Sequence, residues 1–111
     1  MELKSNAIYI FRTYQGEEII ATLNDVTEKA YSVKAPMTLL IDSDGKGGIM
    51  PIPQPFAMFA KDPLKVKFEF TKNGIFTIYE AHENLKEMYT KIVAQANSNI
   101  VLPQKPQLIT G

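Results

Sequence analysis

The sequence contains few residues whose type and spacing could support catalysis. His82 is the only histidine, and a nucleophilic triad built on it would need a Gly-x-Ser-x-Gly turn, which the sequence lacks. A surface or helix-capping role suits His82 better, because it stands next to a predicted helix start. Glu17 and Glu18 form a carboxylate pair, but neighbouring side chains on a strand point to opposite faces and cannot act together as acid and base. The sequence therefore predicts a protein that works by binding or self-assembly and not as an enzyme.

Two further stretches resemble ligand-binding motifs. Residues 42–45 (DSDG) begin like a calcium loop, but an EF-hand loop needs a glutamate at its twelfth position, where Pro53 stands. The glycine-rich stretch 44–48 matches neither the Walker pattern nor the dinucleotide fingerprint. The sequence has no cysteine, which excludes disulfides and thiolate zinc sites. We therefore expect no metal and no cofactor.

The densest basic stretch contains Lys61, Lys65, Lys67 and Lys72. Lys65 and Lys67 share a predicted strand face with Glu69, so this stretch is either a solvated polar face or a patch that contacts phosphate. The whole chain has twelve basic and twelve acidic residues and no net charge. This balance argues against a strongly basic nucleic-acid binder and is compatible with oligomers.

Hydrophobic periodicity predicts five strands and one helix. Residues 7–14 and 17–24, joined at Gly16, predict a hairpin. Apolar residues at odd positions predict a long strand over 31–41, which bends, bulges or lies at a sheet edge at Pro36. Residues 64–71 and 75–80, joined by an Asn-Gly turn, predict a second hairpin. Apolar residues at helical spacing predict a helix over about 82–97, whose apolar stripe packs on the core or on a partner.

The segment 49–60 (IMPIPQPFAMFA) is apolar but has prolines at 51, 53 and 55. Proline excludes a helix here and favours an extended, polyproline-like run that cannot join a sheet. The apolar side chains of this segment must then pack over their own domain or against a neighbouring subunit. The tail over 98–111, with two prolines, is predicted to have little regular structure.

The length of 111 residues fits one domain with one core. Five short antiparallel strands in so small a chain are expected to curl into a partly open barrel, here followed by a C-terminal helix. The sequence shows neither a signal-peptide pattern nor the ~20 consecutive apolar residues that a membrane helix needs. It therefore predicts a cytoplasmic protein without a membrane partner.

Two stretches resemble the signatures of the Sm-like (LSm) family. The first covers residues 9–41 and includes Gly16, the strand after it and the long strand from Tyr31. The second is FTKNGIFTI at 70–78, where the family has an apolar residue, a basic residue and a glycine before the last strand; here Asn73 separates Lys72 from Gly74. The resemblance implies a single Sm-like domain over 1–111, with a small, strongly bent, five-stranded antiparallel barrel of the SH3-like type.

A narrower resemblance comes from residues 9–21 (YIFRTYQGEEIIA) and 55–61 (PFAMFAK). These stretches are similar to a group of uncharacterised Sm-like proteins from tailed viruses of marine cyanobacteria. The resemblance implies a bacteriophage protein that acts in the cytoplasm of the host cell.

The family resemblance also implies a homo-oligomeric ring of five to seven subunits that meet through edge strands. Its expected interface residues are Phe68, Phe70, Ile75, Phe76 and Ile78. The leading hypothesis adds single-stranded RNA bound at the pore by residues Lys29, Tyr31, Lys72, Asn73 and Gly74. The alternative is a viral structural or adaptor protein that oligomerises without binding nucleic acid.

Overall fold

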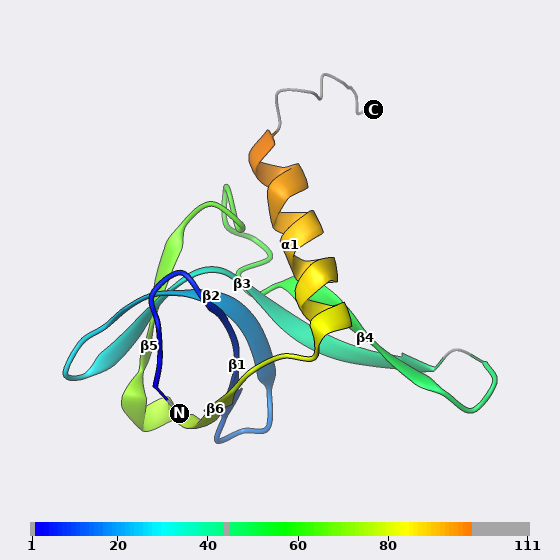
Figure 1. Ribbon diagram of the computed structural model, residues 1–111, viewed down its shortest axis with the longest axis horizontal. Helices are drawn as coiled ribbons and strands as arrows, with labels where there is room; N and C mark the ends of the chain where they lie inside the picture. The colour runs from blue at the N-terminus through cyan, green and yellow to red at the C-terminus, as the bar shows by residue number, and fades with distance from the viewer. Residues whose placement is uncertain (1, 44, 99–111) are drawn as a thin grey trace.

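The computed structural model describes residues 2–43 and 45–98, and for Ser43 and Ser98 only the backbone. Six strands precede one helix (Figure 1). The strands are β1 (Ile8–Thr13), β2 (Glu18–Val26), β3 (Ala30–Ser43), β4 (Ile49–Pro55), β5 (Lys67–Thr71) and β6 (Ile75–Tyr79). A short 3-10 helix, η1 (Lys72–Gly74), joins β5 to β6, and α1 (Glu83–Ser98) follows. The predicted mainly β fold with a C-terminal helix is confirmed, while the tail beyond Ser98 lies outside the described residues.

The strands form one antiparallel sheet in the order β4-β3-β2-β1-β6, with β5 also paired to β3. The first half of β3, residues 30–34, pairs with β5, and its second half, residues 37–43, pairs with β4. The path β6-β1-β2-β3-β5 curls into a small barrel (Figure 1). Among the described residues, β5 and β6 pair with β3 and β1 and not with each other, so the barrel is open between them.

Strand β3 bends at Ala35 and Pro36, as the proline predicts. The pairing of β3 with β2 jumps there, from Ile20↔Met37 to Thr22↔Lys34, which places two residues of β3 opposite one of β2. Such a bulge bends a strand and increases its twist. Ala35 has a φ of 50°, in the left-handed region. The bend lets the first half of β3 belong to the barrel while the second half leaves it.

The prediction that segment 49–60 stays outside the sheet is wrong for its first seven residues. Strand β4 pairs with β3 from Met37↔Pro55 to Ser43↔Ile49, which gives six strands instead of five. The prolines alternate, and alternate residues of an antiparallel strand direct their N–H positions to the same side. Because β4 is the last strand of the sheet, all three missing N–H groups fall on its outer side, where a proline is tolerated.

The predicted second hairpin is also wrong. The Asn-Gly pair lies in η1, and Gly74 lacks the positive φ that a two-residue hairpin turn of this type requires. Strand β5 begins at Lys67 and not near residue 64. The short η1 helix therefore carries the chain from one side of the barrel opening to the other.

Two apolar clusters lie on the two faces of the sheet, because neighbouring strand residues point to opposite sides. The cluster inside the barrel consists of Tyr9, Phe11, Ala21, Leu23 and Val33. The cluster between the sheet and α1 consists of Ile10, Ile20, Ala35, Met37, Ala81 and Tyr89, with Leu85, Ile92 and Val93 packed against it. The apolar stripe of the predicted helix is thus core packing.

Tyr89 fixes α1 to the bend of β3. Its side chain is 1% exposed, and its hydroxyl lies 2.9 Å from the carbonyl oxygen of Ala35 and 3.0 Å from Thr22 Oγ1. A phenol has one proton, so Tyr89 donates to Ala35 and accepts from Thr22. No helix in the described part of the chain is long and apolar enough to span a membrane.

Candidate nucleic-acid interface and strand edges

The structure brings together the two turns that contain the predicted RNA-binding residues. Strand β5 pairs with the start of β3, with Ala30 opposite Thr71 and Tyr31 opposite Phe70. This register places the turn before β3 beside η1, and the backbone N–H of Lys72 donates to the carbonyl oxygen of Lys29 at 2.9 Å. We call the group of Lys29, Tyr31 and Lys72 the basic corner.

The aromatic ring of the basic corner is already in contact on two sides. The Lys72 ammonium lies 5.4 Å from the centroid of the Tyr31 ring, a distance at which a cation is attracted to an aromatic face. The Phe11 ring, in the barrel core, lies 5.8 Å from the same centroid. A nucleobase could therefore stack on Tyr31 only if Lys72 moved away from the ring. Lys29 is exposed, so its ammonium can contact a phosphate without such a movement.

The other two predicted RNA-binding residues extend the corner toward the β1–β2 turn. Asn73 and Gly74 are both exposed. The Gly74 carbonyl oxygen accepts a hydrogen bond from the backbone N–H of Tyr14 at 3.2 Å. This bond ties η1 to the β1–β2 turn, so the five predicted residues lie along one end of the barrel opening.

Four of the five predicted interface residues pack within their own barrel. Phe68, Phe70, Ile75 and Ile78 are partly buried against the inner cluster. Phe56, from the segment after β4, adds edge-to-face contacts, 5.8 Å from the Phe68 ring centroid and 5.3 Å from that of Phe70. These side chains support the edge strands from inside, which leaves the backbone of β5 and β6 for contacts with a neighbour. The interface itself stays a prediction.

Phe76 is the exception, because its side chain faces outward. It is 62% exposed, and its ring meets the exposed Tyr14 ring edge to face, with 5.4 Å between centroids. Nearby, the Tyr79 hydroxyl donates to the Glu18 carboxylate. Burial and this hydrogen bond raise the pKa of Tyr79 from 10.0 to about 12.

The free strand edges of the sheet differ in one respect. The outer edge of β4 carries three prolines, whereas β5 and β6 contain none. An unpaired edge without proline presents N–H and C=O groups that can pair with another strand. Among the described strands, the outer edge of β4 is therefore blocked, while the edges of β5 and β6 on the two sides of the barrel opening are not.

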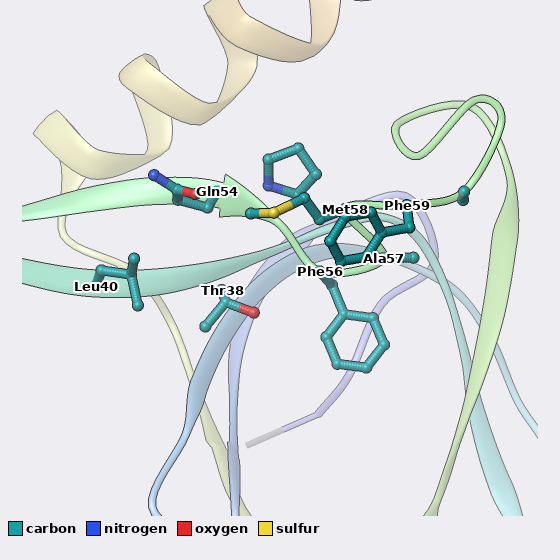
Figure 2. Close-up of a pocket in the computed structure, with 9 residues that line it drawn as sticks. Thr38, Leu40, Gln54, Phe56, Ala57, Met58 and Phe59 are labelled. Atoms are coloured by element: carbon teal, nitrogen blue, oxygen red, sulfur yellow. The ribbon is translucent and has the colours of Figure 1, made fainter.

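An apolar hollow beside β4 was not predicted as a site. It has a volume of about 450 Å³ and lies between Thr38, Leu40, Gln54 and the residues 55–60. Figure 2 shows the Phe56 ring pointing away from Met58 and Phe59, and this ring contacts Phe68 and Phe70 of β5. The sequence signal for the hollow is the apolar run after the prolines, FAMFA, which has neither strand nor helix periodicity.

No three His, Asp or Glu side chains in the described part of the chain come close enough to hold a metal ion. His82 is exposed, and its Nδ1 accepts a hydrogen bond from the Asn84 backbone N–H at 3.3 Å. This contact confirms the helix-capping role. No family model and no curated protein matches the sequence.

Proposed function

We propose that this chain is a ring-forming Sm-like protein that binds single-stranded RNA at the basic corner. The observation that carries the proposal is the pair of proline-free edges, β5 and β6, on the two sides of one barrel opening. Natural proteins usually block or cover free edges, as this chain does at β4. Two unblocked edges on one barrel are therefore best explained by pairing between subunits.

Pairing β5 of one subunit with β6 of the next is a head-to-tail contact. Such a contact repeats until it closes, which gives a ring when the rotation per subunit divides a full turn. Each subunit then places its basic corner in an equivalent position around the axis. Weak contacts from several corners to one strand of RNA gain affinity through the high effective concentration.

The basic corner has the groups that single-stranded RNA needs. Lys29 and Lys72 can neutralise backbone phosphates, and Tyr31 offers a ring for base stacking. In the free protein Lys72 covers this ring. We infer that a phosphate draws Lys72 off the ring and that a base takes its place.

The ring is tested by solution mass and hydrogen exchange on the whole chain. Light scattering should give a closed assembly of five to seven subunits. In that assembly the backbone amides of β5 and β6 should exchange slowly along both edges, although each strand has only one partner within the subunit. A stable monomer, or fast exchange along one edge of β5 or β6 in an oligomer, would refute edge pairing.

RNA binding is tested with a short uridine-rich RNA and two lysine variants. We expect Lys72→Gln to weaken RNA binding several-fold. The slope of log affinity against log salt concentration should also decrease in magnitude by about one, because one phosphate contact is lost. Lys65→Gln is the matched control, since Lys65 is exposed and belongs to the same basic stretch but not to the basic corner. Equal effects of the two variants would show that only overall charge matters.

The alternative is a viral structural or adaptor protein that forms the same ring without nucleic acid. The zero net charge and the exposed apolar side chains beside β4 favour it, because both suit contacts with protein. An unchanged mass in the presence of RNA, with the oligomer intact, would select this alternative.

A further inference from the structure

The paired ends of β3 and β4 form a two-stranded arm. Residues 39–43 of β3 pair with 49–53 of β4, and Figure 1 shows this hairpin projecting away from the barrel. A two-stranded ribbon alone in water is marginally stable at best.

The first face of the arm is apolar along most of its length. Cross-strand partners share a face, so the pairs Leu39↔Pro53 and Ile41↔Pro51 lie on the same side as Ile49. Leu39 packs against the cluster under α1. Further out, Ile41 is 71% exposed and Ile49 is 74% exposed. Two isoleucines thus project into solvent near the tip.

The second face of the arm leads into the apolar hollow. Leu40 and Met50 lie on this face and are each about half exposed. At the base, Leu40 lines the hollow together with Met58 and Phe59. Phe59 is 98% exposed. The Phe59 side chain therefore buries almost none of its apolar surface within its own subunit.

The exposed apolar side chains of the arm and the hollow supply the area of a small subunit contact. Seven large apolar side chains of the arm and the hollow retain between 39% and 98% of their surface; they are Leu40, Ile41, Ile49, Met50, Phe56, Met58 and Phe59. Taken together they expose roughly 800 Å², if each such side chain has on the order of 200 Å² to bury. In one contact the arm of one copy meets the hollow of the next, so these areas add up to about half of the ~1,600 Å² total that a standard interface buries.

We propose that the arm is an assembly arm, whose Ile41 and Ile49 dock in the apolar hollow of a second copy of this chain. Prolines on the β4 edge of the arm block strand addition there. We assign the contact to the exposed apolar side chains of the arm. A protruding apolar face and an apolar hollow of about 450 Å³ occur on the same chain, so a second copy supplies both parts.

The geometry also makes this contact head-to-tail. The two isoleucines and the hollow lie on opposite faces of the arm, so a copy that docks its arm leaves its own hollow free for the next copy. The arm contact goes beyond the edge pairing proposed above and does not require it. Where both form, the arms tie neighbouring subunits together outside the barrel.

The test uses two double variants of the full chain, Ile41→Ser with Ile49→Ser and Met58→Ser with Phe59→Ser. These side chains are at least half exposed, so the free energy of unfolding of the subunit should change little, as circular dichroism in denaturant can verify. Light scattering over a dilution series measures the protein concentration at which half of the assembly has dissociated. We expect this dissociation concentration to rise at least tenfold for each double variant. Val26→Ser, on an exposed residue of β2, is the control and should leave that concentration unchanged.

Mixing the two double variants makes the test specific. Each mixed pair keeps one intact arm and one intact hollow, so an equimolar mixture should form heterodimers through the arm contact that neither variant forms alone. Unchanged association of the single variants, no heterodimer on mixing, or a monomeric wild-type protein would overturn the proposal. Hydrogen exchange of β5 and β6 in the same samples reports on the edges separately, so a failure of the arm contact is distinguishable from a failure of the ring.

Discussion

Removing one hydroxyl group, with Tyr89→Phe, should destabilise the whole domain. The phenol is 1% exposed and bonds Thr22 and the carbonyl of Ala35, at the point where β3 leaves the barrel. Phenylalanine fills the same space but leaves the buried Ala35 carbonyl oxygen and the part-buried Thr22 hydroxyl without this partner. An unsatisfied buried group costs about 1–3 kcal/mol, so we expect the free energy of unfolding to fall by about 2 kcal/mol.

Denaturant titration monitored by circular dichroism measures this loss at fixed protein concentration. The denaturant concentration at the midpoint of unfolding should fall. The slope of the free energy of unfolding against denaturant concentration should stay the same, because the surface exposed on unfolding does not change. Tyr79→Phe is the matched control, since the Tyr79 hydroxyl bonds an exposed carboxylate, and we expect a loss below about 0.5 kcal/mol. A Tyr89→Phe loss no larger than that of the control would refute the view that this hydroxyl holds α1 to the bend.

Two further predictions concern pH and the bend. The pKa of Tyr79 is raised to about 12 by burial and by its bond to Glu18, and burial also raises the pKa of Tyr89. The unfolded chain therefore releases these protons first, so the free energy of unfolding should be retained below about pH 10 and fall as the pH rises toward 12; denaturant titrations on both sides of pH 10 measure the decline, and stability that rises in this range would contradict it. At the bend, Ala35→Val should cost about 2 kcal/mol in the same assay, because Ala35 has a φ of 50° and a β-branched residue is strained there. Ala35→Gly, which tolerates this φ, should stay within about 1 kcal/mol of the wild type.

Local sequence patterns predicted a strand, a bend or a helix correctly where a property of that segment alone decides its structure. The alternation from Tyr31 to Ile41 predicted β3, and Pro36 predicted its bend, because period two and a missing N–H group are properties of the strand itself. The apolar stripe from Leu85 to Ala96 predicted α1 for the same reason. His82 could be placed as a cap from its position before that stripe.

The errors concern pairing between segments distant in sequence. Prolines at 51, 53 and 55 exclude a central strand, but whether they exclude any strand depends on which side of β4 faces a partner. Likewise, Asn73 and Gly74 favour a hairpin only if the strands beside them pair with each other. Here β5 pairs with β3 and β6 with β1, so the same residues form a 3-10 turn.

For the candidate site as well, some features follow from local sequence and others only from the tertiary structure. The sequence by itself determined five of the six described strands, the helix and the residues of two turns, because each depends on neighbours within a few positions. Only the tertiary structure decided that these turns meet, with Lys72 bonded to Lys29 and its ammonium placed over Tyr31. It also decided that Phe68 and Phe70 point into the barrel while Ile41, Ile49 and Phe59 stay exposed. Burial is set by what the rest of the chain leaves uncovered, and no local pattern contains that information.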